Sequence, residues 1–126
     1  MDLELEFTGD VVERQELLNG TETVTVEGVT ADGTWTLTSS FSWNLGLVDF
    51  PGEGDITLTA ANGDELFASL TSAAVRETDA GHAFDLRFEF DGGSGRFGAA
   101  AGTADASGML VGDEFRAHVR SAVHPA

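Results

Sequence analysis

A strong acidic bias distinguishes this chain of 126 residues from proteins that bind polyanions. It has 22 acidic residues and only six arginines, for a formal net charge of −16. Such a surface repels nucleic acid and anionic membranes, because both need a cationic footprint. The absence of cysteine excludes disulfides and thiolate metal sites. The length suits one domain, which we predict over residues 1–126, and the 41% hydrophobic content is enough for a core.

The N-terminal part of the chain predicts strands joined by turns. In residues 2–7 apolar and acidic side chains alternate, which is the period of a half-buried strand and not the pattern of a signal peptide. Residues 8–10 predict a turn, and residues 11–18 fit either a strand, which we favour, or one to two turns of helix. A hairpin turn at residues 19–20 and a strand over residues 21–29 follow. Because no run approaches the ~18 apolar residues of a membrane span, we expect a cytoplasmic protein.

The most regular predicted strand spans residues 34–43, after a turn at Asp32-Gly33. Its odd-numbered positions hold both tryptophans of the chain, and its even-numbered positions hold only threonine and serine. This alternation places Trp35, Phe41 and Trp43 on one face. Residues 44–52 form an apolar loop that is long for a hairpin, and we expect it to act as a lid or as an interface.

Residues 54–70 predict a β-hairpin in the middle of the chain, with its turn at Asn62-Gly63. Two registers are compatible with this turn. A two-residue turn pairs Leu58 with Phe67, whereas a three-residue turn pairs Leu58 with Ala68. Since a slip of one residue reverses the faces of a strand, only one register can hold. We favour the three-residue turn, because it gathers the aliphatic residues on one face.

The C-terminal part continues the same pattern. The even-numbered positions of residues 82–90 share a largely aromatic face, and residues 91–102 form a connection rich in glycine and alanine. Residues 103–110 and 114–123 predict a last hairpin about Gly112-Asp113. The total of about eight or nine short strands, with frequent turn signals and no clear helix, indicates an all-β barrel or sandwich.

Two stretches resemble sequence signatures of the bacterial relatives of allene oxide cyclase. Residues 54–67, GDITLTAANGDELF, are similar to that family's strand, Ala-Asn-Gly-Asp turn and following strand. Residues 92–102, GGSGRFGAAAG, are similar to its Gly-Gly-Thr-Gly-Arg-Phe-Ala-Gly-Ala-Thr-Gly segment, with Ser94 and Ala101 in place of threonine and one Gly-Ala pair swapped. The likeness runs from about Gly33 to the C-terminus, and both motifs concern turns and close backbone approach.

The resemblance implies a single antiparallel barrel of about eight strands that forms a homo-oligomer, a dimer or a trimer. Relatives in this group include plant allene oxide cyclase, dirigent-type proteins and bacterial cyclases that form spirotetronate rings by intramolecular [4+2] addition. They enclose a reactive apolar substrate and use no cofactor. No catalytic residue of these relatives lies within the two matching motifs, so none is transferred to this chain.

Aromatic side chains are the candidates for binding a substrate. An eight-stranded barrel has an interior that side chains can fill or that can hold one small ligand. The same aromatic residues fit three roles: the wall of a pocket, which we favour, a packed core without a lumen, or an oligomer face. The residues expected to bind substrate are Trp35, Phe41, Trp43, Phe67, Phe84, Phe88 and Phe90.

Three polar side chains are the candidates for catalysis. Arg116 and His118 share one face of the last predicted strand, where they would polarise a carbonyl or stabilise an oxyanion if they point inward. An exterior stripe that pairs with acidic groups is the more common arrangement for a charged strand face. Glu65 would act as a general acid or base if buried, although a charge at a hairpin rim is the more common case. The three histidines show no metal-ligand spacing, so we expect no metal.

The expected function is a cofactor-independent cyclase or isomerase, with [4+2] cyclisation as one form of the reaction. Its substrate would be a small hydrophobic, polyketide-like molecule enclosed in the barrel lumen, with no nucleic acid or membrane partner. Catalysis would come mainly from holding the reacting ends close together. The alternative is a non-catalytic ligand-binding or dirigent-like barrel, and a third possibility is a structural oligomer whose barrel is filled by its own side chains.

Overall fold

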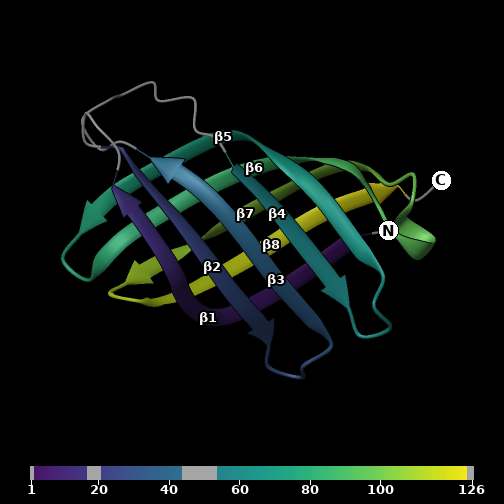
Figure 1. Cartoon of the computed structure of the whole chain (residues 1–126), viewed down its shortest axis with the longest axis horizontal. Helices are drawn as coiled ribbons and strands as arrows, with labels where there is room; N and C mark the ends of the chain where they lie inside the picture. The colour runs from purple at the N-terminus through teal and green to yellow at the C-terminus, as the bar shows by residue number, and fades with distance from the viewer. Residues whose placement is uncertain (1, 17–20, 44–53, 125–126) are drawn as a thin grey trace.

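The chain folds as a closed barrel of eight antiparallel strands (Figure 1). The computed structural model describes residues 2–16, 21–43 and 54–124. Each strand pairs with the next one along the chain, and the first pairs with the last to close the barrel. The strands are β1 (Asp2–Glu16), β2 (Glu22–Thr30), β3 (Trp35–Trp43), β4 (Gly54–Ala60), β5 (Glu65–Thr78), β6 (Gly81–Gly93), β7 (Ala101–Val111) and β8 (Glu114–His124). The predicted antiparallel barrel is therefore confirmed.

Alternation along the strands separates an apolar interior from a polar exterior. On β3, Leu37 and Phe41 are buried, whereas Thr36 and Thr38, on either side of Leu37, are exposed. The largest fully buried side chains come from strands all around the barrel and from the connection after β6: Phe7, Val24, Leu58, Leu66, Phe88, Phe97, Leu110, Val119 and Val123. No helix among the described residues is long and apolar enough to cross a membrane.

The first strand corrects the prediction for residues 8–18. The expected turn at residues 8–10 is wrong, because β1 runs through it while pairing with β2 on one side and β8 on the other. A helix over residues 11–16 is excluded for the same reason, and residues 17–18 lie outside the described part of the chain. Gly9 stands opposite Gly28, and a Cβ there would lie 1.8 Å from the carbonyl oxygen of Glu27. Its role is therefore to admit the neighbouring backbone and not to turn the chain.

The central hairpin has a register that matches neither prediction. Its loop has three residues, as favoured, but these are residues 61–63, and Leu58 faces Leu66. The Ala60 N–H donates to the Asp64 carbonyl oxygen at 2.9 Å, which closes the loop. Gly63 takes a positive φ of 93° at the last loop position, the usual place for a left-handed residue in a three-residue hairpin. Because the register differs from the favoured one by two residues, the aliphatic side chains still share the inner face.

The other connections follow the sequence more closely. The Gly33 N–H donates to the Thr30 carbonyl oxygen at 2.9 Å, which confirms the turn at Asp32-Gly33. The last hairpin turns at Gly112-Asp113, as predicted, because Val111 pairs with Glu114. The connection between β6 and β7 contains a short 3-10 helix, η2 (Gly95–Phe97). The predicted hairpin turn at residues 19–20 and the whole of the apolar loop over residues 44–52 lie outside the described residues.

Candidate functional site

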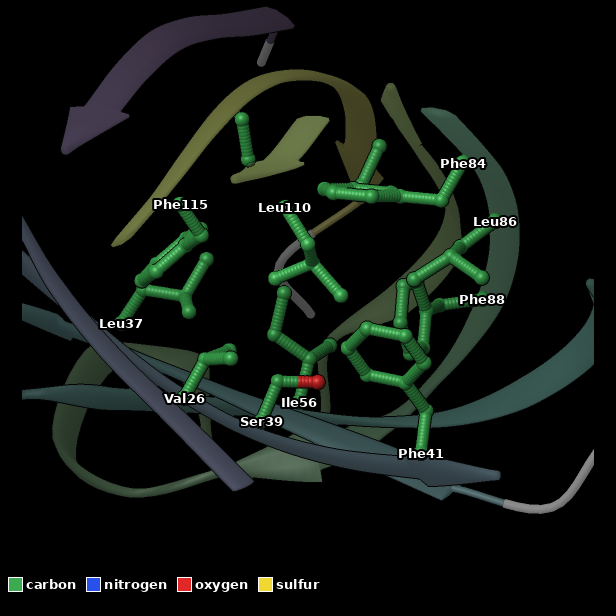
Figure 2. A pocket seen from close by; sticks show the side chains of 12 residues that line it. Val26, Leu37, Ser39, Phe41, Ile56, Phe84, Leu86, Phe88, Leu110 and Phe115 are labelled. Atoms are coloured by element: carbon green, nitrogen blue, oxygen red, sulfur yellow. The ribbon is translucent and has the colours of Figure 1, made fainter. Parts of the chain in front are cut away.

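A small cavity lies inside the barrel, with a volume of about 20 Å³. Figure 2 shows the side chains that line it, which come from six strands: β2, β3, β4, β6, β7 and β8. The lining residues are Val26, Leu37, Ser39, Phe41, Ile56, Phe84, Leu86, Phe88, Ala106, Leu110, Phe115 and Ala117. A space of about 10–15 Å³ is the least that holds one water, whereas ligand pockets measure about 300–1,000 Å³. The described side chains therefore nearly fill the lumen.

Four phenylalanine rings contribute to this filling. The rings of Phe41 and Phe84 pack with their centroids 5.8 Å apart and their planes tilted by 48°, a geometry within the favourable range for aromatic pairs. Phe88 is fully buried beside them. Ala106 and Ala117, on β7 and β8, also line the cavity and occupy little of its space. Large rings on β3, β6 and β8 thus share the lumen with small side chains on β7 and β8.

Among the described residues, the cavity wall has one polar side chain, Ser39 of β3. Ser39 is buried, and its hydroxyl donates to the carbonyl oxygen of Asp55 on β4 at 2.6 Å. None of the other lining residues carries an ionisable or hydrogen-bonding side chain. At its present size the lumen therefore offers apolar contact with the Ser39 oxygen covered, and none of its described lining residues can serve as a general acid or base.

The predicted substrate-binding residues other than Phe67 fall into three groups. Phe41, Phe84 and Phe88 line the cavity. Phe90 is buried in the core outside the cavity lining, and Trp35 packs against Phe97 at the barrel end with ring centroids 6.3 Å apart. The side chain of Trp43 lies outside the described part of the structure. The role of these aromatic residues in binding stays a prediction.

The predicted place of Phe67 in the lumen is corrected. Its side chain lies on the outer face of β5 and is 39% exposed. Leu66 and Ala68, on either side of it, point inward, so alternation sends Phe67 outward. Glu65 shares this outer face and is half-buried. Neither side chain is among those that line the cavity.

Arg116 and His118 also lie on the outside of the barrel, which corrects the arrangement in which they would face a substrate in the lumen. The inner face of β8 is formed by Phe115, Ala117 and Val119, so the alternate positions face solvent. The Nε2 of His118 lies 3.0 Å from Glu4 Oε1, and its Nδ1 lies 2.6 Å from Glu6 Oε1. The exterior stripe that pairs with acidic groups is the arrangement present for His118.

The two motifs that carried the family resemblance meet at one end of the barrel. The Ser94 N–H donates to the Glu65 carbonyl oxygen at 2.9 Å, and the Glu65 N–H donates to Ser94 Oγ at 3.1 Å. Asp64 Oδ2 lies 3.6 Å from Arg96 Nε and accepts the backbone N–H of Arg96 at 3.4 Å. These contacts, which we call the clasp, hold η2 against the β4–β5 hairpin (Figure 1). The fully buried Phe97 belongs to this same segment.

Sequence reasoning did not identify Ser39 as a member of the site. The signal was present, because Ser39 sits on the aromatic stripe between Leu37 and Phe41, where a polar residue interrupts an apolar face. The clasp gave no comparable signal, since its partners are about 30 residues apart in the chain. Among the described residues, no group of three histidine, aspartate or glutamate side chains is arranged to hold a metal ion.

Comparison with protein-family models, with curated proteins and with solved structures gives no match for this chain. The resemblance to the allene-oxide-cyclase-like barrels therefore stays a prediction that rests on the two quoted motifs.

Proposed function

We propose that this protein is a cofactor-free binding protein that takes a small apolar molecule into the lumen of its barrel. The observation that carries the proposal is the composition of the cavity wall, which is apolar and aromatic apart from one hydroxyl. Small-molecule sites are concave and mostly apolar, with few polar groups that orient the ligand. Since none of the described residues that line the cavity is ionisable, binding is the role that this wall supports best.

Binding requires the lumen to expand, because a volume of about 20 Å³ cannot enclose an organic molecule. The rings of Phe41 and Phe84 are the side chains whose rotation would open space, since they pack against each other and line the cavity from neighbouring parts of its wall. Each rotation leaves the strands in place, because their ladders involve only backbone groups. We expect such a movement to accommodate a ligand no larger than a single aromatic ring.

Cyclisation or isomerisation is the second candidate function. The aromatic cavity wall that favours binding also favours this reaction. A wall without acids or bases can still accelerate a ring closure by holding the two reacting ends together. The two candidates differ in turnover: a cyclase converts a polyene into a product of equal mass and different chromatographic retention, whereas a binding protein returns the polyene unchanged. The expected homo-oligomer likewise stays a prediction.

Toluene is a suitable probe for the first candidate. In a protein with labelled methyl groups, we expect saturable NMR shifts at Ile56 and Leu110, which line the cavity, during titration with toluene. Val12 and Val29, which are exposed at 52% and 41%, should show no saturable change. Equal shifts at both sets, or none at the lining methyls, would contradict binding in the lumen.

A matched pair of variants places the binding site. Ala106→Leu adds three carbons inside the cavity, whereas Ala74→Leu adds the same atoms at an exposed position of β5. We expect Ala106→Leu to weaken toluene binding at least tenfold and Ala74→Leu to leave it unchanged. Overpacking costs about 1–3 kcal/mol, so the smaller Ala106→Val replaces the first variant if circular dichroism shows that it does not fold. Similar affinity in all variants would place toluene elsewhere.

A further inference from the structure

We propose that the molecule held in the lumen carries one hydrogen-bond donor, the hydroxyl of a small phenol or alcohol, and that it donates to Ser39 Oγ. This inference rests on the proposed binding function and specifies the chemical class of its ligand. Three observations support it: the position of Ser39 in the wall, the direction of its hydrogen bond, and the apolar character of everything around it.

Ser39 lies in the wall of the cavity, between Val26 of β2 and Ile56 of β4, which are its cross-strand partners and also line the cavity. It is 3% exposed. In Figure 2 its oxygen is the only non-carbon atom among the side chains drawn around the pocket. The oxygen is covered in the cavity as it stands, so a ligand would reach it only once the lumen expands, and would otherwise meet carbon among the described lining residues.

The direction of the Ser39 hydrogen bond is fixed by its partner. Ser39 Oγ lies 2.6 Å from the carbonyl oxygen of Asp55, and a carbonyl oxygen can only accept. The serine hydrogen is thus engaged, and a hydroxyl oxygen with one donor and two lone pairs keeps its acceptor capacity. No hydrogen bond among the described residues is directed to Ser39 Oγ. What Ser39 offers to a ligand is an acceptor and not a donor.

This asymmetry separates ligands by class. A phenol or alcohol would place its O–H on the free lone pair of Ser39 and keep its hydrogen bond after leaving water. An aldehyde or ketone of the same size would bury a carbonyl oxygen without a donor, and an unsatisfied buried polar group is strongly disfavoured. The other two buried hydroxyls of the described residues lie away from the cavity. Thr30 donates to Asp32 in the β2–β3 turn, and Ser121 is not among the lining residues.

The test compares phenol, toluene and benzaldehyde, three probes of similar size, in the wild type and in Ser39→Ala. Dissociation constants come from the methyl shifts of Ile56 and Leu110. We expect the substitution to weaken phenol about 5- to 100-fold more than it weakens toluene, which is the usual range for leaving a buried hydroxyl unpaired. Benzaldehyde should bind weakly to both proteins, with no loss in Ser39→Ala.

The outcomes distinguish this inference from the proposed function. If toluene binds in the lumen and the phenol-to-toluene ratio is the same in both proteins, the inference is wrong and the binding function stands. If benzaldehyde is the probe that loses affinity, Ser39 acts as a donor and the inference is also wrong. If none of the three probes binds, both fail together. Ser39→Cys, which keeps the size and offers only a weak acceptor, gives the same comparison if Ser39→Ala does not fold.

Discussion

Replacing Phe88 by alanine tests whether the lumen is filled as tightly as its small cavity indicates. Phe88 is fully buried on β6, between Leu70 of β5 and Ala104 of β7. Phe67, on the outer face of β5, is 39% exposed and provides a control in which the same atoms are removed from the surface. We expect Phe88→Ala to lower the free energy of unfolding strongly and Phe67→Ala to lower it little.

Two contributions set the size of the Phe88 effect. Burying a phenylalanine side chain fully is worth about 1.5–3 kcal/mol, which the substitution loses. A residual cavity of roughly 100 Å³ costs a further ~2.4 kcal/mol at about 24 cal/mol per Å³. The expected loss is therefore about 4–5 kcal/mol. For Phe67 the first contribution is reduced by exposure and no cavity forms, so a loss of about 1 kcal/mol or less is expected.

Urea unfolding followed by circular dichroism measures both values. A loss below about 1.5 kcal/mol for Phe88→Ala, or a similar loss in the two variants, would refute the view that the lumen is close-packed, because a void of that size should cost more. Phe88→Leu keeps more of the volume and is expected to cost about 1.5 kcal/mol. It remains measurable if the alanine variant does not fold.

Two further predictions concern the polar contacts around the barrel. Asp64→Ala removes the carboxylate of the clasp, so we expect faster hydrogen exchange at the amides of Arg96 and Phe97 and a loss of about 1–2 kcal/mol in the free energy of unfolding. The control, Asp85→Ala, breaks the exposed ion pair with Arg76 and should cost about 0–1 kcal/mol. Equal exchange in both variants would contradict the clasp. The pKa of Asp32 is lowered to about 2 by hydrogen bonds from the Thr30 hydroxyl and then from the backbone and hydroxyl of Thr34. A lowered carboxyl pKa adds stability that is present above pH 3.8 and is lost as the pH falls through about 2. An NMR titration of Asp32 should give a midpoint near 2 in the wild type and a higher midpoint in Thr30→Val. An unchanged midpoint in the variant would refute the Thr30 hydrogen bond as the cause.

Alternation was sufficient to predict which side of most strands faces the core. The stripe that contains Leu37 and Phe41 points inward, and so does the face of β6 that contains Phe84 and Phe88. Phe67 shows the limit of using residue type instead of alternation. Its ring suggested a lumen residue, but the neighbouring positions on β5 fill the inner face, and the chain cannot turn two successive side chains the same way in a regular strand.

Contacts between distant segments could not be predicted from local patterns. Thr8-Gly9-Asp10 has the composition of a turn, and only the approach of β2 and β8 to both edges of β1 explains why the strand continues. The clasp joins Asp64 to Arg96 across 32 positions of the chain. The cavity volume depends on the registers and rotamers of six strands at once, so the sequence indicated an aromatic interior without indicating how much space it leaves.

The distribution of polar groups limits where chemistry can occur in this molecule. The ionisable residues of the described strands lie outside the cavity lining, and His118 of β8, which was predicted to polarise a carbonyl, contacts Glu4 and Glu6 on the outer face. A reaction inside the barrel would have to proceed without proton transfer to a wall residue. Of the described wall residues, Ser39 is the one that we propose fixes the orientation of a bound molecule, because a single acceptor in an apolar space favours poses that place a donor upon it. Selectivity in the lumen should therefore follow the presence of a donor and the size of the molecule, and these two properties can be varied independently in a series of alkylphenols.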